Sequence, residues 1–196
     1  MPARRLRTFA AAILFGLALA IPAGLHAATA DAKLASIHID NFGQVNDHYF
    51  RGAQPEGQDY ADLKALGIKT VIDLTGGDDA STSEPAAVKN LGMNFVRIPM
   101  STHETPSAET IARFLSLVDD PANQPVYVHC QGGRHRTGVM TAAYRMTDEG
   151  WTSDRAFSEM KQYKFGADFL HSEFKDFVYA FHPAPATAVK AAPATK

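Results

Sequence analysis

The chain has 196 residues, of which 45% are hydrophobic and 20% are charged, and its formal net charge at pH 7 is −2. This length fits one domain with short appended segments, and the slight acidic excess excludes the basic face that a nucleic-acid-binding protein would need. The single cysteine, Cys130, cannot form a disulfide within the chain, so the fold does not rest on a disulfide framework.

Residues 1–30 have the pattern of a secretory signal peptide. Three arginines precede an apolar run from Phe9 to Pro22, and Ala28-Thr29-Ala30 offers a small-residue cleavage site. The apolar run is shorter than the ~20 residues that a membrane-spanning helix needs, so a retained anchor is the weaker alternative. We therefore expect a secreted, periplasmic protein that begins near Asp31 and has no stable membrane insertion after cleavage. N-terminal sequencing of the mature protein would test this expectation.

Beyond a lead-in at residues 31–44, short apolar runs alternate with amphipathic stretches. The β-branched and aromatic residues of the short runs favour strands. The expected strands are His48–Arg51, Ile68–Leu74, Asn94–Ile98 and Pro125–His129. The expected helices are Tyr60–Leu66, Glu84–Leu91, Ala108–Val118, Gly138–Glu149, Ser153–Tyr163 and Phe169–Phe181. This alternation predicts a single α/β domain, with a central, mostly parallel sheet of about four to five strands flanked by helices.

Apolar stripes at helical spacing mark the expected core faces of two of these helices. Their members are Ile111, Phe114, Leu115 and Val118 in one helix, and Phe169, Phe174, Phe177 and Phe181 in the other. The domain is expected to cover residues 45–182. Residues 183–196 are rich in Pro, Ala, Thr and Lys, and we expect them to be disordered.

The most informative segment follows the last predicted strand and reads His129-Cys130-Gln131-Gly132-Gly133-Arg134-His135-Arg136-Thr137-Gly138. Five residues between Cys130 and Arg136 can curl into a cradle whose backbone N–H groups point inward, forming an anion nest. A helix starting near Thr137 would add its positive N-terminal end, and the two glycines allow positive φ. Arg136 would offer a planar fork to two phosphate oxygens. Such surroundings favour a thiolate, so Cys130 is predicted to attack phosphorus.

This loop resembles that of the cysteine-dependent protein tyrosine and dual-specificity phosphatases. The resemblance is closest to the small atypical dual-specificity phosphatases of fungi and plants and their bacterial relatives. Two other stretches also resemble that family. The opening strand and turn of the family are similar to Tyr49-Phe50-Arg51-Gly52-Ala53-Gln54-Pro55. Its second strand is similar to Leu66-Gly67-Ile68-Lys69-Thr70-Val71-Ile72-Asp73-Leu74. The resemblance implies a phosphatase domain over about residues 45–180 that works without a cofactor.

The resemblance also implies roles for the residues of the loop. His129 would order the loop through hydrogen bonds, and Thr137 would donate its hydroxyl to the sulfur, with helix capping as the alternative. Arg134 and His135 would add positive charge at the rim of the site, unless they are simply solvated. The predicted substrate-binding residues are Gln131, Gly132, Gly133, Arg134, His135 and Arg136.

The general acid is less clear from the sequence. The family usually supplies an Asp from a mobile loop before the cysteine, but the corresponding segment, Ile98 to Pro106, contains no Asp. Glu104 and His103 are the available proton donors there, with Glu104 slightly favoured. Asp73 is a third candidate for the acid, although a role in capping the following turn better explains why an Asp occurs there. Arg51 is expected to have a structural role.

Together these features predict an exported phosphatase that hydrolyses phosphomonoesters through a phosphocysteine intermediate. The substrate would be a phosphotyrosine protein or a small phosphorylated molecule such as an inositol polyphosphate or pyrophosphate. No metal site is predicted, because the eight histidines show no His-x-x-x-His spacing. Two alternatives remain. One is a rhodanese-like sulfurtransferase, which a thiosulfate–cyanide assay would reveal, and the other is a catalytically weak phosphate-binding module.

Overall fold

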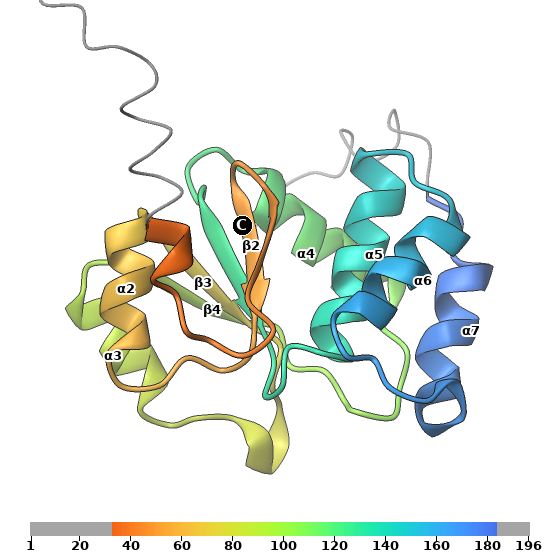
Figure 1. Cartoon of the computed structure of the whole chain (residues 1–196), viewed down its shortest axis with the longest axis horizontal. Coiled ribbons are helices and arrows are strands. Elements are labelled where there is room, and N and C mark those ends of the chain that lie inside the picture. Colours follow the sequence, from red (N-terminus) through yellow and green to blue (C-terminus); the bar gives the residue numbers. More distant parts are fainter. Residues whose placement is uncertain (1–32, 184–196) are drawn as a thin grey trace, which may run out of the picture.

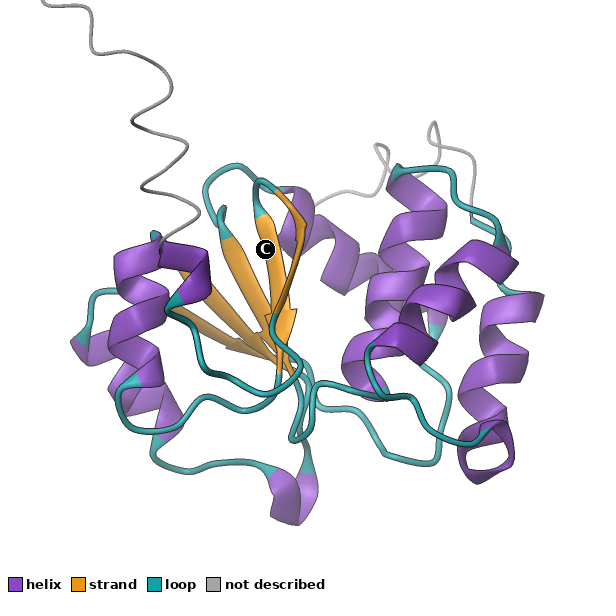
Figure 2. Ribbon diagram, viewed as in Figure 1, coloured by secondary structure: helices purple, strands orange, loops and turns teal. Residues whose placement is uncertain are grey.

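A five-stranded sheet forms the centre of the computed structural model, which describes residues 33–183 (Figures 1 and 2). The strands are β1 (Gly43–Asn46), β2 (Tyr49–Gly52), β3 (Thr70–Asp73), β4 (Asn94–Arg97) and β5 (Val126–His129). Their order is β1-β2-β5-β3-β4, and only β1 runs antiparallel to its neighbour. The predicted α/β class, with a mostly parallel sheet, is confirmed. The predicted signal peptide and residues 184–196 lie outside the described residues.

Helices cover both faces of the sheet (Figure 1). The helices are α2 (Asp59–Leu66), α3 (Glu84–Asn90), α4 (Ala108–Asp119), α5 (Arg136–Asp148), α6 (Ser153–Gln162) and α7 (Ser172–Ala180), with 3₁₀ turns η1 (Gly77–Asp79) and η2 (Asp168–His171). Side chains alternate along each strand, so Val71 and Tyr127 pack with α2 and α3, whereas Ile72 and Val128 pack with α4 to α7. None of the helices within residues 33–183 is long and apolar enough to cross a membrane.

The N-terminal edge of the domain differs from the prediction. The packed domain begins before residue 45, because Ile39 is buried and Phe42 packs against the core beside α2 and α3. Strand β1 was not predicted, since Val45 is the only apolar residue in its four-residue sequence. This polar run forms a strand because it lies at the edge of the sheet and pairs only with β2, which sets its register.

Phe169 does not belong to the core stripe predicted for the last helix. Residues 168–171 form the 3₁₀ turn η2 rather than the first turn of α7, so Phe169 is 80% exposed. Phe174 is fully buried, and Phe177 and Phe181 pack partly against the core, as predicted. The stripe of Ile111, Phe114, Leu115 and Val118 on α4 is also buried as predicted.

The strand that precedes the cysteine is the central strand of the sheet. In register, His129 at the end of β5 lies beside Gly52 of β2 on one side and Asp73 of β3 on the other. The carboxyl ends of the parallel strands therefore meet where Cys130 begins the loop, which is the edge where α/β sheets place their sites. Helix α5 starts directly after this loop, at Arg136, and is buried along nearly its whole length.

Candidate active site

The backbone carbonyls of the loop after Cys130 are all bonded to groups outside the cavity. The carbonyl oxygen of Gln131 accepts from the Gln54 amide at 3.1 Å, and that of Gly132 from Asn41 Nδ2 at 2.8 Å. The carbonyl of Gly133 accepts from Arg51 Nη2 at 2.7 Å. The next two carbonyls accept from the first turn of α5, in the pairs Arg134–Gly138 and His135–Val139.

This arrangement leaves the amide side of the loop available to a ligand. Within residues 33–183, the backbone amides of residues 131–135 donate to no other group. A run of such amides ahead of a helix N-terminus forms a concave site for an anion. The shape of the predicted anion nest therefore depends on hydrogen bonds from Gln54, Asn41, Arg51 and the first turn of α5 to successive carbonyls of the loop.

Gly133 is the loop residue that requires glycine. Its φ is +63°, in the left-handed region, and a Cβ atom there would lie 2.4 Å from the Gly52 carbonyl carbon. Gly132 has neither constraint, since a Cβ there would meet only the flexible Arg134 side chain at 3.5 Å. Gly133 thus allows the loop to pass close to β2, whereas the backbone at Gly132 does not require glycine.

Arg51 lies buried beneath the loop. Besides its bond to the Gly133 carbonyl, its guanidinium stacks over the Tyr163 ring at 4.0 Å. Burial lowers the pKa of Arg51, and attraction to surrounding groups, Cys130 among them, acts in the opposite direction. An arginine remains charged even so. Arg51 therefore supports the loop mechanically and also places a fixed positive charge behind the thiol.

Arg136 is held in place before any ligand binds. Its side chain is only 4% exposed, and Nη2 donates to Asp79 Oδ2 at 3.0 Å. Nη1 lies 3.5 Å from the carbonyl oxygen of Met100. These contacts engage one edge of the guanidinium and leave further N–H groups for an anion. Asp79, which comes from η1, is thus a positioning residue for Arg136.

A cavity of about 440 Å³ opens above the loop. Its walls combine loop residues with two residues of the segment after β4 and one from η2. The lining residues are Thr102, His103, Cys130, Gln131, Gly132, Arg134, His135, Arg136 and His171. A neighbouring depression of about 390 Å³ shares Thr102 and Arg136 with it. An apolar cavity between α4 and α7 contains no residue of the loop, so we assign the chemistry to the cavity at Cys130.

His129 is fully buried between two carboxylates. Its Nε2 lies 3.0 Å from Glu84 Oε1 and its Nδ1 lies 4.0 Å from Asp73 Oδ1. The angles at Nε2 do not meet hydrogen-bond geometry, so these are close polar contacts rather than hydrogen bonds. Asp73 is occupied elsewhere, since it accepts from the Thr75 amide at 2.7 Å and from Arg97 Nε at 2.6 Å. Asp73 therefore caps the turn and pairs with Arg97, and it lies outside the cavity.

The rim of the cavity carries cationic and imidazole groups. Arg134 lines the cavity, and its Nη2 lies 3.7 Å from Asp40 Oδ2 at the surface. His135 Nε2 lies 3.0 Å from the Phe165 carbonyl oxygen, and its ring is 3.7 Å from that of His171, centre to centre. Burial lowers the pKa of His135, and repulsion from the charged Arg134 and Arg136 acts in the same direction. Arg134 therefore contributes the fixed positive charge at the rim, whereas burial disfavours the charged form of His135.

The two predicted proton donors occupy different positions. His103 lines the cavity together with Cys130, whereas Glu104 is exposed and lines neither this cavity nor the depression beside it. Thr137 is fully buried in the first turn of α5, and its hydroxyl makes no hydrogen bond within residues 33–183, to the sulfur or elsewhere. His135, not Thr137, is the residue that precedes the helix.

Four residues that support or line the site could not be recognised from the sequence. Asn41, Asp79, Glu84 and His171 lie far from the loop along the chain and reach it only through the fold. Glu84 is the first residue of α3, where an acidic residue is explained by the helix dipole alone.

Comparisons with known proteins found phosphatases among the relatives of this chain. Residues 32–176 match the family model described as a DSP-PTPase phosphatase fused to NAD+ kinase. The dual specificity protein phosphatase TpbA of Pseudomonas aeruginosa (strain UCBPP-PA14) is 30% identical over 171 residues, which are 84% of this chain and 75% of that protein. The inositol diphosphatase SIW14 of Saccharomyces cerevisiae is 25% identical over 131 residues, which are 64% of this chain and 46% of that protein.

Solved structures of both relatives share the fold. The crystal structure of P. aeruginosa TpbA superimposes with a TM-score of 0.62 at 25% identity and covers 77% of this chain and 89% of that one. The core catalytic domain of the PP-IP phosphatase SIW14 from S. cerevisiae, in complex with citrate, gives a TM-score of 0.64 at 22% identity, covering 74% and 86%.

Proposed function

We propose that this cysteine-dependent phosphatase, which belongs to the dual-specificity and tyrosine phosphatase family, is exported and hydrolyses small molecules that carry several phosphates. The observation that carries the substrate part of this proposal is the cationic character of the cavity lining, and the signal-peptide pattern of residues 1–30 supports export. Within the described residues, its lining includes two arginines and three histidines but no Phe, Tyr or Trp ring. A polyanion would find two guanidinium groups and the free amides of the loop there.

The chemistry begins with the thiolate of Cys130. Its sulfur attacks phosphorus, and an S–P bond forms as the bond to the leaving oxygen breaks. The loop amides and Arg136 stabilise the charge on the three remaining phosphoryl oxygens. A general acid donates a proton to the leaving oxygen. Water then attacks phosphorus, the S–P bond breaks, and the deprotonated acid accepts the water's proton, so that inorganic phosphate and the thiolate result.

We assign the proton donor to His103, because it lines the cavity and Glu104 does not. His103→Ala is expected to slow hydrolysis of alkyl phosphates by about 10²-fold or more. Aryl phosphates should be affected far less, because their leaving groups hardly need a proton. Steady-state kinetics on both substrate classes, with Glu104→Gln as the matched variant, measures this difference. If Glu104→Gln instead shows the dependence on leaving group, the assignment reverts to Glu104.

The substrate proposal is supported by the relative named as an inositol diphosphatase and by Arg134 at the rim. Arg134→Ala is expected to lower kcat/KM for an inositol pyrophosphate by about tenfold, the loss of one charge-assisted contact. It should change kcat/KM for a simple aryl phosphate by less than about twofold. Lys89→Ala removes an exposed cation far from the cavity, on α3, and serves as the control.

A phosphotyrosine protein is the second candidate substrate, because TpbA, named as a dual specificity protein phosphatase, is similar over most of this chain. A side-by-side measurement of kcat/KM on phosphotyrosine peptides and inositol pyrophosphates separates the two. The polyanion proposal is wrong if the peptides are the better substrates and Arg134→Ala lowers all rates equally.

A further inference from the structure

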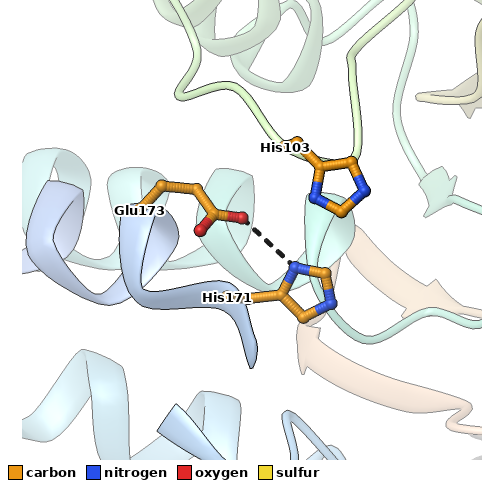
Figure 3. A group of neighbouring side chains, drawn as sticks. All are labelled: His103, His171 and Glu173. Atoms are coloured by element: carbon orange, nitrogen blue, oxygen red, sulfur yellow. Dashed lines mark hydrogen bonds and ion pairs between the residues drawn. The ribbon is translucent and has the colours of Figure 1, made fainter. Parts of the chain in front are cut away.

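Three metal-ligating side chains meet beside the cavity, where the segment after β4 passes the start of α7. Figure 3 shows His103 above His171 and Glu173, with the carboxylate directed at the imidazole of His171. One ligand atom from each residue lies within 4.8 Å of the other two. We propose that His103, His171 and Glu173 bind a zinc ion. Two imidazoles and one carboxylate form a ligand set that zinc sites use, and imidazole favours first-row divalent ions of this kind.

Two of the three ligands already have the required spacing. His171 Nδ1 lies 3.2 Å from Glu173 Oε1. In a tetrahedral zinc site with bonds of about 2.1 Å, neighbouring ligand atoms are about 3.4 Å apart. The hydrogen bond drawn in Figure 3 therefore holds the pair at nearly the distance that a shared ion would impose.

His103 can complete the site with a small movement. Its ring lies nearly parallel to that of His171, at 18°, with centroids 5.8 Å apart. The residue is exposed, and within residues 33–183 its side chain makes no hydrogen bond that an ion would have to break. Because no two ligand atoms in the group are more than 4.8 Å apart, His103 needs to approach by no more than about 1.5 Å to reach tetrahedral spacing.

His171 is well fixed for this role. Its side chain is only 16% exposed, and its ring packs against His135 at 3.7 Å and Phe174 at 6.0 Å between centroids. Ligands oriented by surrounding contacts bind metal more tightly than free side chains do. This group could not be predicted from the sequence, because His103 is far in the chain from His171 and the pair His171–Glu173 has no recognised ligand spacing.

The position of the group connects it with the active site. Both histidines line the same cavity as Cys130, so an ion between them would lie in its wall. Three protein ligands leave a fourth coordination position free for water or a phosphate oxygen. An imidazole that ligates zinc no longer carries the proton assigned to His103 above, so the zinc-loaded protein should hydrolyse alkyl phosphates more slowly. Zinc binding itself does not depend on the substrate proposed above.

Cobalt titration of the Cys130→Ser protein, prepared without a histidine tag, tests the proposal. The serine removes the thiolate, which would otherwise bind zinc and confuse the result. We expect one equivalent of Co²⁺ to produce the intense visible absorption of a four-coordinate site, and Zn²⁺ to displace it. Absence of saturable Co²⁺ and Zn²⁺ binding would overturn the proposal.

Variants in the same Cys130→Ser background identify the ligands. His103→Ala, His171→Ala and Glu173→Gln should each weaken Co²⁺ and Zn²⁺ binding by at least about tenfold. His38→Ala, at an exposed histidine outside the cavity, is the matched control and should have no effect. Glu173→Gln keeps the shape of a partly exposed side chain, so an unchanged melting temperature together with weaker metal binding assigns its effect to the lost carboxylate. The site is wrong if His38→Ala weakens binding as much as the three ligand variants do.

Discussion

Cys130→Ser is expected to reduce turnover of any phosphomonoester by at least about 10⁴-fold. The loop would keep its shape, because the carbonyls of residues 131–133 remain bonded to Gln54, Asn41 and Arg51. The variant should therefore still bind inorganic phosphate, with a dissociation constant within a few-fold of the wild type. Initial rates and calorimetric titration with phosphate measure the two quantities.

Arg136→Ala provides the contrast to that variant. It removes the buried fork that Asp79 positions, so both phosphate affinity and rate should fall. Together the two variants separate the nucleophile from the anion-binding cradle. Substantial turnover by the Cys130→Ser protein would rule out the phosphocysteine intermediate.

Gly133→Ala is expected to lower kcat/KM by about 10²-fold, the effect of displacing a catalytic group by about 1 Å. The added Cβ would lie 2.4 Å from the Gly52 carbonyl carbon and 2.7 Å from the Ala53 amide nitrogen, which are backbone atoms of β2 and its turn. The left-handed φ adds about 1–2 kcal/mol of strain. The loop must therefore move away from β2, and the melting temperature should fall as well.

Gly132→Ala is the matched control, because it adds the same methyl group one residue earlier in the same loop. The nearest atoms belong to the flexible Arg134 side chain at 3.5 Å. Its kcat/KM and melting temperature should stay close to those of the wild type. Equal effects of the two substitutions on kcat/KM would contradict the close approach of Gly133 to β2.

The cradle could be predicted from the sequence because its parts are consecutive. Residues 129–138 specify the strand end, the loop and the helix start, and local geometry then fixes where the amides point. The helices and the strands β2 to β5 were predictable for a similar reason, since each has its own run or stripe of apolar residues, which β1 lacks. Phe169 shows the limit: the period continued through it, but a 3₁₀ turn directs its ring to solvent.

The groups that support the loop could not be predicted, because they depend on the pairing of distant segments. Arg51 reaches Gly133 only because β2 lies beside β5, and Glu84 reaches His129 only because α3 lies against the sheet. A polar residue in such a segment is indistinguishable, in sequence, from one on the surface. The same reason explains why His171 at the cavity wall was not foreseen.

The burial of Arg51 has a consequence for how the site responds to salt. Dissolved ions screen exposed charges over about 8–10 Å at ordinary ionic strengths but act much less on buried ones. Arg134, whose side chain is 46% exposed, is therefore expected to attract an anion mainly in dilute buffer, whereas the buried Arg51 and Arg136 are expected to act almost independently of salt. Long-range capture and short-range retention of the anion are thus assigned to different arginines, and only capture weakens as ionic strength rises.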